Sequence, residues 1–127
     1  MSASDSRPFY LNLIKIHLPI QGVVSIMQRI TGVLLFIAIP FSVYLLDLSL
    51  QGDAGFAQAQ EILSSIIIRI GILILLWSLL HHFYAGIRYL LIDFDIGVDK
   101  QGSRITAWTV LALEIITLAV ILIGVCS

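Results

Sequence analysis

The residues of this chain that are best suited to chemistry lie where long apolar segments meet polar ones. His81 and His82 follow a largely apolar run over residues 66–80 and adjoin the first polar residues after it. Neighbouring residues on a helix point about 100° apart, so only one of the two imidazoles can face a given partner. A neutral imidazole is a common ligand of haem iron. The alternative is that both are interfacial side chains whose polar tips reach water.

His82 is the better candidate of the two for binding a large planar group. It shares a helix face with Gly86, one turn later, and with Ser78, one turn earlier. The missing side chain at Gly86 leaves a flat gap beside the imidazole, whereas His81 has the methyl group of Ala85 in the equivalent place. Haem is the planar group that most often requires a histidine. The spacing therefore favours His82 over His81 as an iron ligand.

A second candidate site lies near the start of the first long apolar segment. Ser25 and Arg29 are four residues apart, so they share one face of a helix, and Gln28 borders that face. A hydroxyl group beside a fixed cation can bind a carbonyl or an anionic group at the mouth of a pocket. The alternative is that Arg29 extends to lipid headgroups while Ser25 bonds its own backbone.

Glu114 is an acid within the last apolar segment. It lies about ten residues, hence about 15 Å, into the helix expected there, near the middle of a membrane. An unpaired carboxylate at that depth would be costly, so we expect it to be protonated or bonded to a partner. A role in proton transfer and a purely structural pairing are both compatible with this position.

The composition predicts an all-α membrane protein. Of the 127 residues, 59% are hydrophobic and only 12% are charged, and the mean hydropathy is +1.04. This composition excludes an ordinary soluble domain, and a net charge of −1 gives no reason to expect nucleic acid as a partner. The one cysteine, Cys126, excludes an internal disulfide and a cysteine-bound metal cluster.

Three transmembrane helices account for the apolar segments, because runs of about 18 residues or more match a hydrocarbon layer of about 30 Å. We expect these helices at about 21–50, 57–92 and 104–125, within a single membrane-anchor domain formed by residues 1–127. Residues 1–20 mix apolar and polar side chains, which predicts a segment lying at the membrane surface. Polar side chains at membrane depth need partners, so we expect the chain to be part of a larger assembly.

The distribution of basic residues predicts the orientation in the membrane, because cytoplasmic loops are enriched in lysine and arginine. The basic residues gather before or at the start of the first helix and around the link between the second and third helices: Arg7, Lys15, Arg29, Arg88, Lys100 and Arg104. The N-terminus should therefore be cytoplasmic and the C-terminus periplasmic, in a bacterial inner membrane. Arg29 and His82 then lie toward the same side.

Two motifs resemble those of the cytochrome b subunits of succinate dehydrogenase, which are membrane anchors of respiratory complex II. The first motif consists of His82, Gly86, Ile87, Arg88 and Asp93. The second consists of Arg7-Pro8 and the segment 25–32, Ser-Ile-Met-Gln-Arg-Ile-Thr-Gly. Together with three helices at the expected spacing, the resemblance covers nearly the whole chain.

The resemblance implies a role for each candidate residue. His82 would be one axial ligand of a haem b, and a second membrane-anchor subunit would supply the other. Ser25 would hydrogen-bond a quinone, and Arg29 would contact the quinone or a haem propionate. Gln28 would lie at the quinone or at the haem edge. Related chains often carry a histidine at the position of Gln28, which can hydrogen-bond but cannot titrate.

The resemblance also implies partners for this chain. A flavoprotein subunit would oxidise succinate, and an iron–sulfur subunit would pass the electrons to quinone at the membrane. This chain would then perform no succinate chemistry itself. Two other functions stay open, namely a haem-free anchor of a quinol:fumarate reductase and a non-catalytic membrane assembly subunit. A haem absorption band in the purified complex would favour the haem-binding cytochrome b subunit over these two alternatives.

Overall fold

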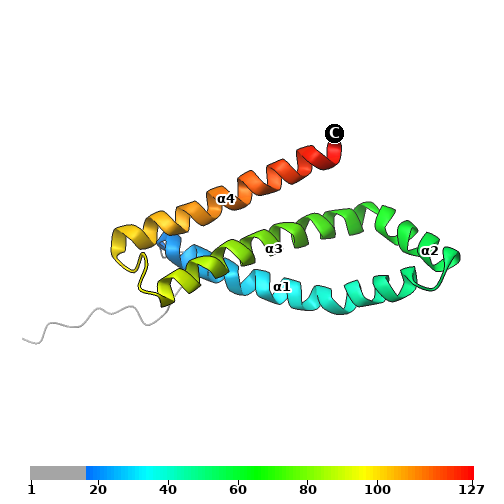
Figure 1. Cartoon of the computed structure of the whole chain (residues 1–127), viewed down its shortest axis with the longest axis horizontal. Helices are drawn as coiled ribbons and strands as arrows, with labels where there is room; N and C mark the ends of the chain where they lie inside the picture. Colours follow the sequence, from blue (N-terminus) through cyan, green and yellow to red (C-terminus); the bar gives the residue numbers. More distant parts are fainter. Residues whose placement is uncertain (1–16) are drawn as a thin grey trace, which may run out of the picture.

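The computed structural model describes residues 17–127, and every regular element in this range is a helix (Figure 1). The helices are α1 (Ile20–Ser49), α2 (Asp53–Ser64), α3 (Ile66–Asp93) and α4 (Lys100–Cys126). Of these, α1, α3 and α4 are long and apolar enough to cross a membrane. The prediction of an all-α fold with three candidate transmembrane helices is confirmed. The surface segment predicted for residues 1–20 lies mostly outside the described residues.

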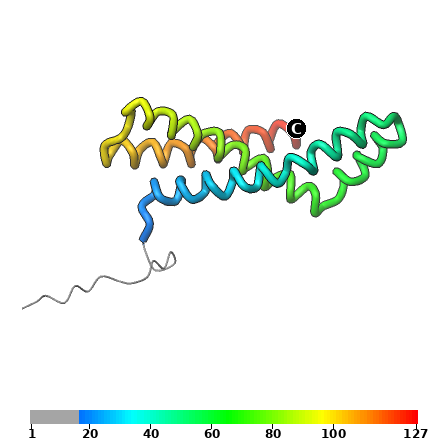
Figure 2. Tube along the Cα trace, turned by 90° about the horizontal axis from the view of Figure 1, so that it is seen from below, coloured from blue at the N-terminus to red at the C-terminus, as the bar shows by residue number. Residues whose placement is uncertain are grey.

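The three long helices come together at one end of the molecule. The start of α1, the end of α3 and the start of α4 lie at this end, and α2 lies at the other (Figures 1 and 2). We call the first of these the basic end, because four basic residues belong to it: Arg29, Arg88, Lys100 and Arg104. Both candidate sites therefore lie toward the basic end.

The single helix predicted for residues 57–92 is wrong, because α2 and α3 meet at a break at Ser65. The backbone of Ser65 is extended, with φ −59° and ψ 133°, and its carbonyl accepts a hydrogen bond from the amide of Arg69. The hydroxyl group of Ser64 donates to the carbonyl of Glu61 at 2.7 Å. Serine side chains compete for backbone hydrogen bonds in this way, and two in succession favour a helix boundary over a helix interior.

The connections at both ends of this helix pair also differ from the expected boundaries. α2 begins at Asp53 because Gly52 adopts a positive φ of 92°, which turns the chain back. Gly55 then packs against the carbonyl of Leu48 so closely that no Cβ would fit there. α4 begins at Lys100 rather than near residue 104, because the Asp99 carboxylate caps it by accepting from the amide of Gly102 at 3.0 Å.

The packed interior of the molecule is small and lies toward the basic end. Its centre consists of small or β-branched residues from all three long helices: Val24, Ala85, Ala107 and Val110. Small side chains let helix backbones approach closely, which is how helices associate in lipid. Most residues of α1, α3 and α4 are half-buried or exposed, and their large exposed apolar side chains are available to lipid or to other subunits.

Candidate functional site

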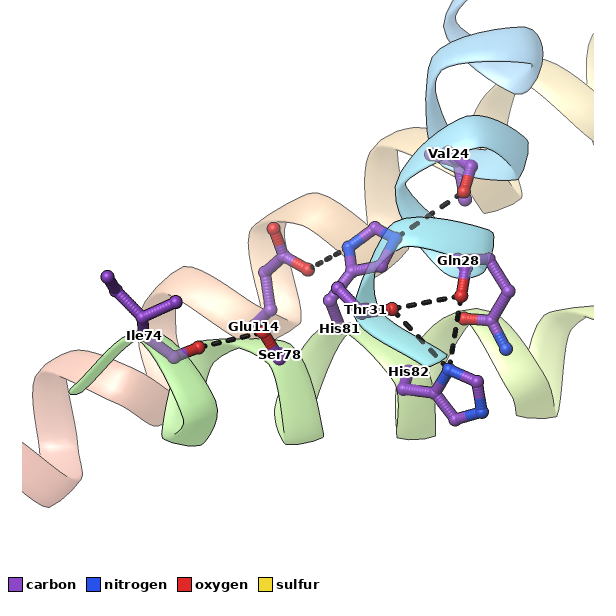
Figure 3. Close-up of polar contacts among 8 residues, drawn as sticks. All are labelled: Val24, Gln28, Thr31, Ile74, Ser78, His81, His82 and Glu114. Carbon is purple, nitrogen blue, oxygen red and sulfur yellow. Dashed lines mark hydrogen bonds and ion pairs between the residues drawn. The ribbon is translucent and has the colours of Figure 1, made fainter. Parts of the chain in front are cut away.

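The two adjacent histidines point to different sides of α3 (Figure 3). His81 is fully buried, with 0% exposure, between α1 and α4. His82 is half-buried and lies against one turn of α1. The prediction that only one of them can face a given partner is therefore confirmed.

The surroundings of His82 determine which of its ring nitrogens carries the proton. Its Nδ1 lies 3.2 Å from the carbonyl oxygen of Gln28 and 3.4 Å from the Thr31 hydroxyl oxygen. That hydroxyl group already donates its own hydrogen to the Gln28 carbonyl at 3.0 Å. Both neighbours of Nδ1 are thus acceptors, so Nδ1 is the donor and the Nε2 of a neutral ring keeps a lone pair. The Nε2 edge points away from the other labelled side chains in Figure 3.

The surroundings of His81 place the hydrogen on the other ring nitrogen. Its Nε2 faces the carbonyl oxygen of Val24 at 3.4 Å, and a carbonyl can only accept, so Nε2 carries a hydrogen. Its Nδ1 lies 2.6 Å from Oε2 of Glu114, which is itself only 3% exposed. Both ring nitrogens of His81 are therefore engaged, and neither is available to a metal. The expectation that Glu114 is protonated or bonded to a partner is confirmed, and His81 is that partner.

Two glycines lie near His82, and the one that makes room for its ring is on the facing helix α1. A Cβ atom at Gly32 of α1 would lie 3.1 Å from Cε1 of His82, closer than ordinary contact. A Cβ atom at Gly86 would meet only the side-chain nitrogen of Gln28, at 3.8 Å. The surface at Gly86 is therefore open, as the spacing predicted, while Gly32 is the residue that lets the imidazole approach α1.

Ser78 is more deeply buried than His82, with which it was predicted to share a face. Ser78 is fully buried, and its hydroxyl group donates to the carbonyl of Ile74 in its own helix at 2.8 Å. It lies three residues before His81 and four before His82, and both spacings are compatible with a shared face. Packing against the other helices, rather than the spacing, places it on the interior side.

The second candidate site adjoins the turn of α1 that holds His82. Nη2 of Arg29 donates to the hydroxyl oxygen of Ser25 at 3.4 Å, as their shared face predicted. Arg29 is exposed and lines a shallow groove of about 260 Å³ with Ile30, Val33 and Leu34. The side chain of Gln28 is half-buried, and its Oε1 has no hydrogen-bond partner within residues 17–127.

The structure brings the 25–32 segment of α1 next to His82 on α3, and Arg7-Pro8 of the second motif lies outside the described residues. Three features of this site were not predicted from the sequence: the backbone carbonyl of Gln28, the hydroxyl group of Thr31 and the close approach at Gly32. All three belong to the 25–32 motif, which was the available signal. Among residues 17–127, no three His, Cys, Asp or Glu side chains gather closely enough to hold a metal ion.

Comparison with known proteins identifies the family of this chain. Residues 3–121 match the family model described as the succinate dehydrogenase/fumarate reductase transmembrane subunit. The chain belongs to this family. It is thus an integral membrane protein, in agreement with its three long apolar helices.

Several relatives are similar to this chain over nearly its whole length. A succinate dehydrogenase cytochrome b556 subunit from Coxiella burnetii is 34% identical over 120 residues, which is 94% of each chain. One from Paracoccus denitrificans is 28% identical over 93% of this chain and 91% of its own. One from Rickettsia prowazekii is 31% identical over 88% of this chain and 87% of its own. The resemblance seen in the two sequence motifs is therefore confirmed.

Proposed function

We propose that this chain is the membrane-anchoring cytochrome b subunit of a succinate:quinone oxidoreductase, and that it binds haem b together with a partner anchor subunit. The observation that supports this most directly is the state of His82. Its Nδ1 donates to α1, which leaves the Nε2 lone pair directed away from the packed interior. The relatives named as cytochrome b556 subunits are consistent with this assignment.

The residues around His82 fit a haem. The one available imidazole nitrogen of His82 would bind the haem iron, and Gly86 leaves the adjoining surface open for a planar group. When bound, the haem supplies a one-electron carrier within the membrane. The hydrogen bond from Nδ1 to the Gln28 carbonyl holds the ring in one orientation and one tautomer. A partner subunit would supply the second iron ligand, because both nitrogens of His81 are engaged and His17 is exposed ahead of α1.

The Ser25–Arg29 pair is the proposed contact with quinone. Because Arg29 donates to the oxygen of Ser25, the hydrogen of that hydroxyl group is free to donate to a quinone carbonyl. The guanidinium group stabilises negative charge that develops on the quinone, or on a haem propionate, in a poorly solvated site. Gln28 is the proposed residue at the quinone or haem edge, and its side-chain oxygen, which has no partner within the described range, supports this role.

The remaining parts of the proposal concern partners and location. Succinate is oxidised on a flavoprotein subunit, and electrons reach quinone through an iron–sulfur subunit. The exposed apolar surfaces of α1, α3 and α4 face lipid and the second anchor, in a bacterial inner membrane. The 1–127 chain forms one membrane-anchor domain in this complex.

A reduced-minus-oxidised absorption spectrum of the purified membrane complex tests the proposal. We expect the α band of a low-spin b-type haem. A complex without this band would contradict haem binding and would favour a haem-free fumarate reductase anchor or an assembly subunit.

The proposed orientation makes a separate prediction. With the basic end toward the cytoplasm and three crossings, a reporter fused after Ser127 should report a periplasmic location. A fusion of the same reporter between α3 and α4, after Val98, should report the cytoplasm and serves as the control. A cytoplasmic signal from the Ser127 fusion would contradict three crossings.

Gly32→Val should lower the haem content of the complex several-fold, because a Cβ atom at this position already crowds the His82 ring and valine adds two methyl groups. Gly71→Val is the matched control, since nothing lies within 4 Å of a Cβ atom there. The measurement is haem per complex by pyridine haemochrome assay. Equal haem content in both variants would show that the approach of His82 to α1 is not required.

A further inference from the structure

The rotation of α3 about its own axis is not determined by its hydrophobic residues. Large apolar side chains are exposed on opposite faces of this helix: Ile67, Ile70 and Ile74 share one face by helical spacing, and Leu79, Phe83 and Leu90 share the opposite one. Lipid is as apolar as these side chains, so burying one set rather than another gains little. Small and polar residues must therefore select the face of α3 that packs inward.

The buried side of α3 is a seam of such residues. Ser78, His81, Ala85 and Arg88 follow one another at spacings of three and four, and none is more than 4% exposed. Within residues 17–127, the Ser78 side chain bonds only its own helix, and Arg88 donates to Ser103 and Thr106 near the start of α4. His81 alone in the seam has polar contacts to both other long helices, through Glu114 of α4 and the Val24 carbonyl of α1.

We infer that Glu114 is a positioning residue, and that its contact with His81 determines which of the two adjacent histidines offers a nitrogen to iron. This inference rests on the proposed haem ligation by His82. Because the two side chains point about 100° apart, holding His81 between α1 and α4 directs His82 to the other side. We call this contact the His81–Glu114 clamp.

The clamp is compatible with membrane depth because it carries no net charge. Nε2 of His81 holds one hydrogen toward Val24, and a second hydrogen lies between Nδ1 and the Glu114 carboxyl group. Whether that second hydrogen resides on nitrogen or on oxygen, the pair as a whole is neutral. A neutral, fully bonded pair avoids the cost of an isolated buried charge.

Without Glu114, the buried Nδ1 of His81 would have no partner on α4. A buried polar group without a partner is destabilising, so α3 would gain by turning His81 away from the interior. Such a rotation moves His82 out of its contact with α1 and brings His81 toward the same position. The expected result is a mixture of ligation states.

The test compares three variants in the purified whole complex, by haem content and by the electron paramagnetic resonance spectrum of the oxidised haem. Glu114→Gln should keep one wild-type low-spin signal, because the amide NH₂ group can donate to Nδ1. Glu114→Leu should lower the haem content several-fold and give a second low-spin signal. Combining Glu114→Leu with His81→Leu should restore one signal, because no buried polar group then lacks a partner and no competing histidine is left.

The outcomes that would overturn the inference are distinct. A single wild-type signal with full haem content in Glu114→Leu would show that the clamp does not position His82. The inference would also be overturned if Glu114→Leu loses haem and the additional His81→Leu substitution does not restore it. A double variant that does not assemble counts as such a failure to restore haem. A wild-type complex without a haem band would instead contradict the proposed function itself.

Discussion

Replacing His82 by alanine should abolish normal bis-histidine ligation of the haem, which is one of the two largest effects expected in this chain. The Nε2 of His82 carries the proposed iron-binding lone pair, and its Nδ1 is held by the Gln28 carbonyl. Haem in this variant should be absent, weakly held or bound by a neighbouring residue. The measurements are haem content and the reduced-minus-oxidised spectrum of the purified complex.

His81→Ala is the matched control, since it removes the same side chain one position away. This variant should keep the low-spin spectrum, because His82 is intact and no neighbouring histidine competes with it. The yield of complex should fall, because Glu114 loses its partner, at a cost of about 1–3 kcal/mol.

The double variant His81→Ala with His82→Ala resolves one ambiguity. In His82→Ala alone, a rotation of α3 could bring His81 to the iron and preserve a low-spin signal. If the spectrum survives the loss of both histidines, this chain does not supply an axial ligand.

Arg29→Leu should depress quinone reduction while leaving succinate oxidation by a soluble dye intact. Hydrogen bonds to charged groups are worth about 1.5–3 kcal/mol, so we expect quinone reduction to fall by roughly 10- to 150-fold. Electron transfer to the dye depends on the hydrophilic subunits, which the substitution does not touch. The ratio of the two activities in the same preparation is the measurement.

Two further variants make this result specific to the Ser25–Arg29 pair. Arg69→Leu removes an exposed arginine at the start of α3, far from the basic end, and should change neither activity. Ser25→Ala removes one neutral hydrogen bond, worth about 0.5–1.5 kcal/mol, and should raise the KM for quinone by about 2- to 10-fold. Equal loss of both activities in Arg29→Leu would indicate failed assembly and leave no case for a quinone pocket there.

The sequence by itself determined the architecture and the parts of the site that depend on helical spacing. Long apolar runs can satisfy their backbone hydrogen bonds in lipid only as helices or closed barrels, so three transmembrane helices followed from length and composition. The Ser25–Arg29 contact followed from a spacing of four residues. The two motifs also indicated the family, because side-chain identity at fixed spacing is a property of sequence alone.

The tertiary structure decided the features that depend on rotation and on backbone groups. The spacing could not tell on which side of α3 Ser78 lies, because an all-round apolar helix has no preferred inner face. The carbonyl groups of Gln28 and Val24 fix opposite proton positions on the two histidines, and a carbonyl is common to every residue type. The break at Ser65 lies where the polar end of α2 meets the apolar start of α3, and the hydrogen bond of Ser64 to its own backbone marks it. For Ser78 and for the two histidines, contacts between helices rather than residue type determined the outcome.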